Sequence, residues 1–361
     1  MVYIDRNGLT DFCRQVFRTI GLSEVEADDS AKILVDADAR GIASHGVSRL
    51  QRYVYGIQEG VMVSGVKPTV LRETPISYVL DGNGAMGLSL SRTTMDTVIS
   101  KAKEHGVCFS SVRNSNHFGI AGFYAEMAAR QDMIGIGMTN TAAMGVPTFA
   151  RDPYFGTNPI AVAVPASNGR IFCLDMATTV VTRGKIEIHA REGKSIPSGW
   201  AVDTTGHGTN DPVRLIEDML YLRGGGLMPL GGEGEMLSGY KGYGLATVVD
   251  IMTALLSGGP FGRDVMDSEN TSARVCHFFG AIRLDLFRDP EAFKADMGRM
   301  LDELNSLRPA EGCERVYYAG QKEHEAEERS WKCGVPVTEK LYDELCNIGL
   351  QILGRKLERL S

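Results

Sequence analysis

The sequence predicts an α/β (α+β) fold in which helical segments from both ends of the chain fold together around a central sheet. Two observations indicate this class. Apolar residues recur at helical spacing before residue 60 and after residue 288, and five short strand-like runs lie between residues 76 and 176. At 361 residues the chain exceeds what one compact core usually covers, so we expect two domains. They are a helical domain of residues 1–75 together with 288–361, and a central α/β domain of residues 76–287.

The N-terminal part is expected to hold three helices. The apolar repeat of the first helix ends at Gly21, and Ser23 with Glu26 forms the S-x-x-E capping pattern that typically begins a helix. The third helix is expected to begin near Ser44, which we interpret as its N-cap.

The central part alternates strands with helices. Strands are expected at 76–81, 107–112, 134–139, 160–165 and 171–176, because each run is short and apolar and ends in polar or glycine-rich residues. Helices are expected at 91–105 and 120–130, and two amphipathic helices at 291–307 and 338–360.

The composition excludes several classes of protein. Lys and Arg number 38 against 45 Asp and Glu, a net charge of −7, which argues against a nucleic-acid partner because phosphate backbones attract a basic face. No apolar run approaches the roughly 18 residues that cross a bilayer, since Asp250 interrupts the longest candidate, 245–256. The first residues show no basic segment followed by an apolar one. We therefore expect a cytoplasmic protein without a membrane partner.

The cysteines predict neither a disulfide framework nor a metal site. There are seven, an odd number, and no two form a C-x-x-C pair. We expect most of them to be small buried apolar side chains in a reducing compartment, and we expect no bound metal.

The first candidate for chemistry is the segment from Ser44 to Tyr53. His45, Arg49 and Tyr53 are four residues apart and would share one helix face. A histidine titrates near neutral pH and an arginine can bind a carboxylate through two parallel hydrogen bonds, so the pattern is typical of a site for a small carboxylic acid. The alternative is a capped surface helix with incidental polar residues.

The second candidate is the turn 114–119, between an expected strand and an alanine-rich helix. Side chains at such a turn lie at the carboxyl edge of a sheet, where ligands usually bind in α/β folds. His117 would lie in the first helical turn, where the helix dipole favours a neutral imidazole. The alternative is that Asn116 caps the helix and His117 fills space.

A third candidate combines two turns, one with Thr157 and Asn158 and one at the strand end Asp175–Ala177. A carboxylate that follows an apolar strand enters a partly dry environment, so Asp175 needs a partner such as a histidine. A structural turn would also account for either segment.

Two glycine-rich segments resemble phosphate-binding loops. Lys241 lies among glycines before an expected helix and could present its ammonium to phosphate oxygens, although the segment does not match the P-loop pattern. Residues 82–87 fit G-x-G-x-x-G, but the next expected strand runs into Arg113 and Asn114 rather than the acidic residue that binds a ribose. We interpret the second segment as a tight turn.

Taken together, these segments resemble the type-2 malate/L-lactate dehydrogenase family, and the malate dehydrogenase branch in particular. The resemblance spans essentially the whole chain in order. It is carried by GIASHGVSRL (41–50), RNSNHFGIAGFYAEMAA (113–129), MTNT (138–141), FGTNPIAVAVP (155–165), LDMATTVVTRGKIE (174–187) and SGYKGYGLATVVDI (238–251).

The resemblance implies a fold distinct from the Rossmann type, that of L-sulfolactate dehydrogenase. It has a central, largely antiparallel mixed sheet flanked by helices and a helical domain built from both chain ends. The resemblance also implies NAD or NADP as cofactor, and a homodimer whose active site lies near the domain and subunit boundaries.

The resemblance also implies a role for each candidate residue. His117 matches the usual proton acceptor, and His45 matches a histidine named as the acid/base in some members. Asp175 would orient one of these imidazoles, and Ser44, Arg49 and Tyr53 would bind the substrate. Cofactor contacts are implied for Asn116, Thr139, Asn140, Thr157, Asn158, Asp175, Met176, Ala177, Lys241, Gly320, Gln321 and Lys322.

The activity expected from this resemblance is hydride transfer between NAD(P)(H) and a small 2-hydroxy or 2-oxo acid, with malate and oxaloacetate as the first pair. One alternative is reduction of another 2-oxo acid (of the lactate, ureidoglycolate or sulfolactate type) or of a cyclic imine carboxylate. A more distant alternative is a cofactor-binding protein without catalysis. The chemistry suits the residues, because hydride loss from an alcohol carbon requires a base for the hydroxyl proton.

Overall fold

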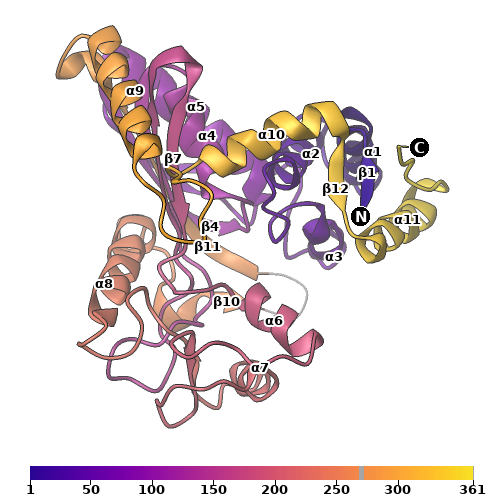
Figure 1. Ribbon diagram of the computed structural model, residues 1–361. Coiled ribbons are helices and arrows are strands. Elements are labelled where there is room, and N and C mark those ends of the chain that lie inside the picture. Colours follow the sequence, from indigo (N-terminus) through magenta and orange to yellow (C-terminus); the bar gives the residue numbers. More distant parts are fainter. Residues whose placement is uncertain (268–271, 361) are drawn as a thin grey trace.

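The computed structural model describes residues 1–267 and 272–360, and an eight-stranded mixed sheet forms its centre (Figure 1). The strands follow the order β2-β3-β4-β11-β5-β6-β7, and β10 pairs with β11. Only the β3–β4 pair within these described strands is parallel. The predicted class, an α/β fold with a largely antiparallel mixed sheet, is therefore confirmed. The strands are β2 (Thr69–Thr74), β3 (Ser77–Asp81), β4 (Val107–Asn116), β5 (Met133–Thr139), β6 (Ile160–Pro165), β7 (Ile171–Met176), β10 (Met266–Asp267) and β11 (Ser272–Arg283).

The strands form where apolar residues alternate between the two faces of the sheet. Along β5 and β6, every second residue is buried, as the period of two in a strand requires. The predicted strands 160–165 and 171–176 coincide with β6 and β7. The central strand β11 and the edge strand β2 were not among the predicted strands.

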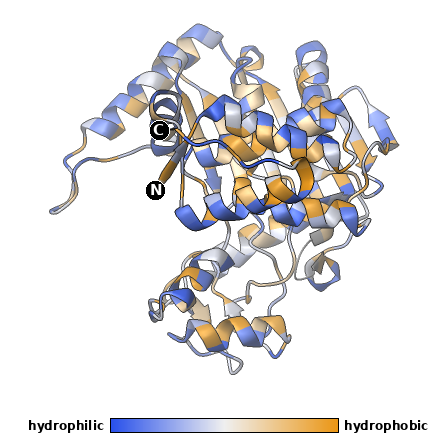
Figure 2. Ribbon diagram, turned by 90° about the vertical axis from the view of Figure 1, so that its right-hand side faces the viewer, coloured by the Kyte–Doolittle hydropathy of each residue, from blue (hydrophilic) through white to orange (hydrophobic). Residues whose placement is uncertain are grey.

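Helices cover both faces of the sheet. The helices α4 (Gly87–His105) and α5 (Ala121–Ala129) pack on one face. On the other face the Ser111 hydroxyl donates to backbone carbonyls of a π-helical turn, Ile251–Leu255, which continues α8 (Gly239–Asp250). In Figure 2, hydrophobic and hydrophilic residues alternate along the helices nearest the viewer, as helices with one buried and one exposed side require.

The two ends of the chain come together in a helical region. It contains α1 (Arg6–Thr19), α2 (Glu24–Ala39), α3 (Leu50–Gln58), α10 (Gln321–Cys333) and α11 (Glu339–Leu353), and β1 (Val2–Ile4) pairs with β12 (Val335–Val337) (Figure 1). Its core is continuous with that of α4, α5 and the sheet, from Phe12 and Leu34 to Tyr124 and Phe279. The ninth helix, α9 (Pro290–Ser306), packs instead near the turn Ser167–Gly169 between β6 and β7.

The central segment also holds a smaller core of its own. Around Ile186, Leu215 and Leu227 it packs α6 (Arg183–Arg191) and α7 (Pro212–Leu220) against the short pair β8 (Ala201–Val202) and β9 (Gly226–Leu227). This part lies below the sheet in the view of Figure 1. The two-domain division at residues 75 and 288 stays a prediction.

The N-terminal helices begin largely as their capping residues predict. Ser23 and Glu26 form both hydrogen bonds of the capping box at the start of α2. The third helix is different, because a 3₁₀ turn, Val47–Arg49, precedes α3 and Gly46 occupies the cap position. The prediction of Ser44 as N-cap is therefore wrong.

Three general features bear on function. All seven cysteines are free thiols. Within residues 1–267 and 272–360, no group of three or more His, Cys, Asp or Glu side chains is placed to hold a metal ion. None of the helices in those ranges has the length and apolar character needed to span a bilayer.

Candidate active site

The structure brings the two candidate histidines together. His45 lies in the turn that connects α2 to α3, and His117 directly follows β4. Their rings stack with centroids 5.6 Å apart and planes inclined by 22°. Two imidazoles that are distant in the sequence thus share one half-buried position between the helical region and the sheet.

A tyrosine fixes the orientation of His117. The hydroxyl of Tyr53, on α3, lies 2.5 Å from His117 Nδ1, and the Gly119 N–H donates to the same nitrogen at 3.3 Å. Tyr53 is fully buried. Its hydroxyl, predicted to bind substrate, is therefore engaged with the imidazole, and His117 Nε2 is the ring nitrogen left to meet a ligand.

Ser44 and Arg49 lie beside His45. The Ser44 hydroxyl is 2.8 Å from His45 Nδ1, and Arg49 Nε donates to the Ser44 backbone oxygen at 2.7 Å. Ser44 is exposed and Arg49 is half-buried, so both polar groups are accessible beside His45.

The surroundings keep both imidazoles neutral. Burial lowers the pKa of His45 to about 4, and the positive charges of Arg49 and Arg52 act in the same direction. Burial also places the pKa of His117 well below its usual value, again with a contribution from the neighbouring charges. At neutral pH the site therefore presents two uncharged imidazoles under a positive potential, which favours binding of an anion.

Asp175 lies at the end of β7, where it caps another element. Its Oδ2 accepts a hydrogen bond of 2.7 Å from the Gly122 N–H in the first turn of α5. We expected Asp175 to orient an imidazole, but its hydrogen bond goes to this helix, and Tyr53 occupies the orienting position on His117. Asp175 lines a cavity, described next, and its limited contact with water there raises its pKa to about 6.

A cavity of about 300 Å³ joins Asp175 to the segment from 317 to 323. Ile42 and Ile120 also line it, and these residues flank the turns that carry His45 and His117. Gly320 has a φ of 88°, and a β-carbon there would lie 3.0 Å from Cys173, so a glycine is required at this wall. The remaining lining residues are Arg40, Gly122, Glu126, Cys173, Leu174, Tyr317, Tyr318, Ala319, Lys322 and Glu323.

The sequence analysis missed two buried charged residues that line this cavity, Arg40 and Glu126. Glu126 accepts from Arg40 at 2.7 Å, from Arg130 at 2.9 Å and from His324 Nε2 at 3.0 Å. The paired cations and these hydrogen bonds hold the pKa of Glu126 well below its usual range, despite its burial. The available signal was that Glu126 is the only charged residue of the otherwise apolar α5.

Several predicted cofactor contacts have side chains that the protein itself occupies. Asn116 donates to the Gly84 and Ala85 carbonyls and so pins the glycine-rich turn 82–87. Asn140 bridges Pro260 and Cys276. Asn158 donates to Ala246 and Asp250, and Thr139 is hydrogen-bonded to His277. If these residues meet a cofactor, they do so mainly through their backbone.

The other predicted cofactor residues lie in four places. Met176 and Ala177 are half-buried at the end of β7, and Thr157 is hydrogen-bonded to Thr141. Gln321 donates to Glu325 within α10. Lys241 is exposed on α8, with its Nζ 5.9 Å from the ring centre of Tyr240, and it does not line the cavity described above.

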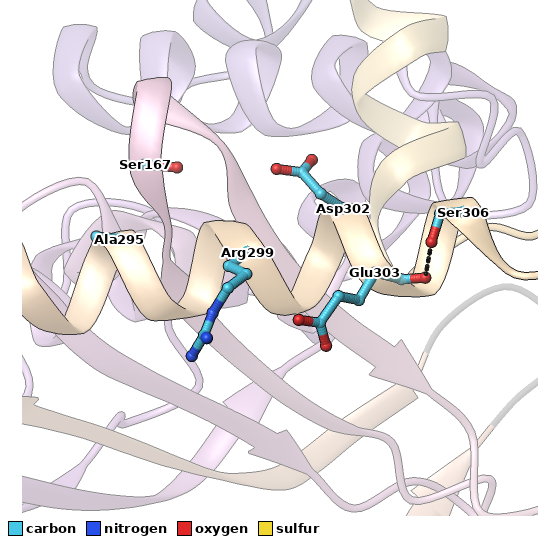
Figure 3. Close-up of a pocket in the computed structure, with 6 residues that line it drawn as sticks. All are labelled: Ser167, Ala295, Arg299, Asp302, Glu303 and Ser306. Carbon is cyan, nitrogen blue, oxygen red and sulfur yellow. Dashed lines mark hydrogen bonds between the residues drawn. The ribbon is translucent and has the colours of Figure 1, made fainter.

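A second hollow, of about 510 Å³, lies over α9 (Figure 3). None of the predicted site residues contributes to it. Its lining residues are Ser167, Ala295, Arg299, Asp302, Glu303 and Ser306. The histidines and the cavity beside Asp175 therefore form the candidate active site.

Comparison with known proteins identifies dehydrogenases, both among protein families and among individual proteins. The malate/L-lactate dehydrogenase family matches residues 4–346. A malate dehydrogenase from Pyrococcus abyssi is 42% identical over 357 residues, which covers 99% of this chain and 97% of that protein.

Two solved structures share the fold. Malate dehydrogenase from Entamoeba histolytica superposes with a TM-score of 0.92 at 33% identity, covering 97% of this chain and 98% of the other. Sulfolactate dehydrogenase from Methanocaldococcus jannaschii superposes with a TM-score of 0.87 at 33% identity, covering 99% and 98%. The predicted fold, that of L-sulfolactate dehydrogenase, is confirmed.

Proposed function

The chain belongs to the malate/L-lactate dehydrogenase family, and on that premise we propose that it transfers a hydride between NAD(P)(H) and a small 2-hydroxy or 2-oxo acid. It is an oxidoreductase, and malate with oxaloacetate is the first substrate pair, since similar proteins over the full chain length are named malate dehydrogenases.

The observation that carries this proposal is the convergence of His45, His117 and Arg49. A guanidinium beside two stacked neutral imidazoles suits an acid whose neighbouring oxygen gains or loses a proton. Arg49, with the Ser44 hydroxyl, would bind the carboxylate and so fix the orientation of the reacting carbon. His117 would take up a proton at Nδ1 when the acid binds and donate its Nε2 proton to the carbonyl oxygen, with the reverse transfers in the oxidation direction, while Tyr53 holds the ring.

Substrate binding itself would prepare the proton transfer. The positive charges of Arg49 and Arg52 contribute to the low pKa of the imidazoles. A bound carboxylate offsets these charges, so the pKa of His117 rises when an acid is present. The site would therefore take up a proton together with its 2-oxo acid.

The cavity beside Asp175 would receive one part of the dinucleotide. Its volume of about 300 Å³ is at the lower end of small-molecule sites, and Ile42 and Ile120 in its lining flank the histidine turns. Asp175, Met176 and Ala177 at the end of β7 would hold the cofactor together with residues 320–322. When bound, the nicotinamide supplies or accepts the hydride.

Steady-state rates with NADH and with NADPH test the proposal. The panel is oxaloacetate, pyruvate, 2-oxoglutarate, sulfopyruvate and a cyclic imine carboxylate. We expect turnover of oxaloacetate with at least one cofactor. Turnover of the imine alone would overturn the malate proposal, and cofactor binding without any turnover would indicate a protein without catalysis.

Two further proposals follow from the same premise. Family resemblance implies a homodimer, which light scattering of the purified protein would test. The cytoplasmic location expected from the sequence also stays a prediction, which fractionation of the source cells would test.

A further inference from the structure

The turn that carries Ser44, His45 and Arg49 lacks a cap of its own. Its 3₁₀ segment Val47–Arg49 follows Gly46, which has no side chain to accept the first backbone N–H. The acceptor comes from another element, because Asp38 in the last turn of α2 accepts a 2.6 Å hydrogen bond from the Val47 N–H.

Gly46 and Asp38 are packed directly against each other. A β-carbon on Gly46 would lie 2.0 Å from Asp38 Oδ2 and 2.2 Å from its Cγ. Asp38 is 3% exposed, and its Oδ1 has no hydrogen-bond partner among the described residues. A buried carboxyl with one donor is costly, so its retention at this place indicates a role in holding the turn.

We propose that Asp38 is a positioning residue for the substrate, which acts by capping the turn that presents Ser44, His45 and Arg49. The inference rests on the proposed function only for the identity of the ligand. Asp38 itself does not touch the reacting atoms. Asp38 holds the turn in place through its hydrogen bond from the Val47 N–H and through its contact with Gly46.

The strength of this cap depends on ionisation near neutral pH. Burial raises the pKa of Asp38 to about 7, and the Val47 N–H partly opposes this shift. From α1, the Cys13 thiol faces the same carboxyl, and its pKa is itself raised, so it stays uncharged. An ionised carboxylate accepts a stronger hydrogen bond than a neutral acid, so the turn is held more firmly at pH 8 than at pH 6.

Two variants with a matched control test the proposal. Asp38→Ala removes the acceptor, whereas Asp38→Asn keeps an oxygen for the Val47 N–H but does not titrate. The control is Asp29→Asn, because Asp29 is another buried carboxyl of α2 that pairs with Ser89 and Arg92, not with the turn.

The kinetic readout is KM for the best 2-oxo acid of the panel, with the Kd of the reduced cofactor measured separately. For Asp38→Ala we expect KM to rise about tenfold, the loss of one hydrogen bond to a charged group, with the cofactor Kd within twofold. For Asp38→Asn the KM ratio to wild type should be near one at pH 6 and several-fold at pH 8. Asp29→Asn should leave KM unchanged.

Amide hydrogen exchange across residues 44–49 provides a readout that does not require turnover. At pH 6, protection should fall in Asp38→Ala and persist in Asp38→Asn and Asp29→Asn. If the wild type reduces no acid but protection follows this order, the proposed function fails while the cap stands. Equal KM and equal protection in Asp38→Ala and wild type would overturn the proposal, as would a KM ratio for Asp38→Asn that does not change with pH.

Discussion

His117 depends on its neighbours for its chemistry. Tyr53 of α3 contacts its Nδ1, His45 stacks on its ring, and the dry surroundings keep it neutral. A neutral imidazole with one nitrogen engaged has one nitrogen for a ligand, which is what proton exchange with a hydroxyl or carbonyl oxygen requires.

His117→Ala is expected to lower kcat by about 10²-fold or more, because proton transfer by a positioned base contributes that much. Fluorescence titration should show that NADH or NADPH still binds. His105→Ala, at the end of α4, serves as control and should not change the rate. Normal activity of the His117 variant would reassign the base to His45.

Arg49→Ala is expected to raise KM for the acid by about tenfold or more, since a charge-assisted hydrogen bond to the carboxylate is lost. A smaller fall in kcat should accompany it, because the reacting carbon is less well aligned. Arg49→Lys should recover only part of the loss, as a lysine cannot bind a carboxylate through a planar fork. An unchanged KM would place the substrate carboxylate elsewhere.

Tyr53→Phe is expected to lower kcat by about three- to tenfold, the cost of one neutral hydrogen bond, with KM nearly unchanged. The acidic limb of the pH–rate profile should shift, because the hydroxyl contacts His117 Nδ1. A thermal unfolding scan checks that the fold is intact. A change in KM without a change in kcat would indicate that Tyr53 meets the substrate instead.

At the scale of elements, local signals predicted the sequence-adjacent features well. The runs at 160–165 and 171–176 coincide with β6 and β7, and the Ser23–Glu26 capping box is formed. The elements that were not predicted depend on contacts between residues far apart in the sequence. The central strand β11 includes His277, a polar residue inside the core that Thr139 and Ser115 satisfy from the neighbouring strands. Those partners cannot be identified from the local pattern.

The same limit explains the start of the third helix. Ser44 has the residue type of an N-cap, but the structure caps this turn with Asp38, which lies earlier in the chain on another helix. The carboxyl at Asp38 is one of several acidic residues in α2, and the sequence alone does not tell which of them faces inward.

Glu126→Gln is expected to destabilise the protein by about 1.5–3 kcal/mol at pH 7, because the buried Arg40 loses one of its carboxylate partners and keeps Asp36 and Glu327. The folded-state pKa of Glu126 lies below its usual value, so its contribution is present above pH 5 and is lost as the pH falls. Urea unfolding at pH 7 and pH 4 should show the difference between variant and wild type shrinking at the lower pH. Glu187→Gln, which alters an exposed i,i+4 pair with Arg183, is the control and should be nearly neutral.

At the scale of the whole molecule, the candidate site could be predicted as residues but not as an arrangement. His45, His117 and Asp175 stand out in the sequence because titratable side chains follow glycine-rich or apolar segments. In the structure Asp175 caps α5, and Tyr53 holds His117. Both contacts depend on how four segments pack together, which local sequence patterns do not reveal. Glu126 and Arg40 escaped notice for the same reason, since each is read locally as a polar residue of a helix.

Acid should weaken the fold partly through His277. Burial lowers the pKa of His277 to about 3, whereas an exposed histidine titrates near 6.5, so the unfolded chain binds the proton first. The stability from this group is present above about pH 6.5 and is lost as the pH falls, by up to about 1.4 kcal/mol per pH unit. The urea midpoint of His277→Gln should depend less on pH between 6.5 and 4 than that of the wild type. An equal dependence would show that other groups control acid unfolding.

The wall of the cavity at 317–323 and the pairing of β1 with β12 have a consequence for biosynthesis. A nascent chain on the ribosome possesses both histidines and Arg49 long before it has the segment that closes the cavity beside Asp175. Its first strand waits for residues 335–337 to emerge from the exit tunnel before it finds its partner. Activity would therefore be acquired only after residues 317–337 have left the exit tunnel, and ribosome-bound fragments that stop before residue 317 should be inactive.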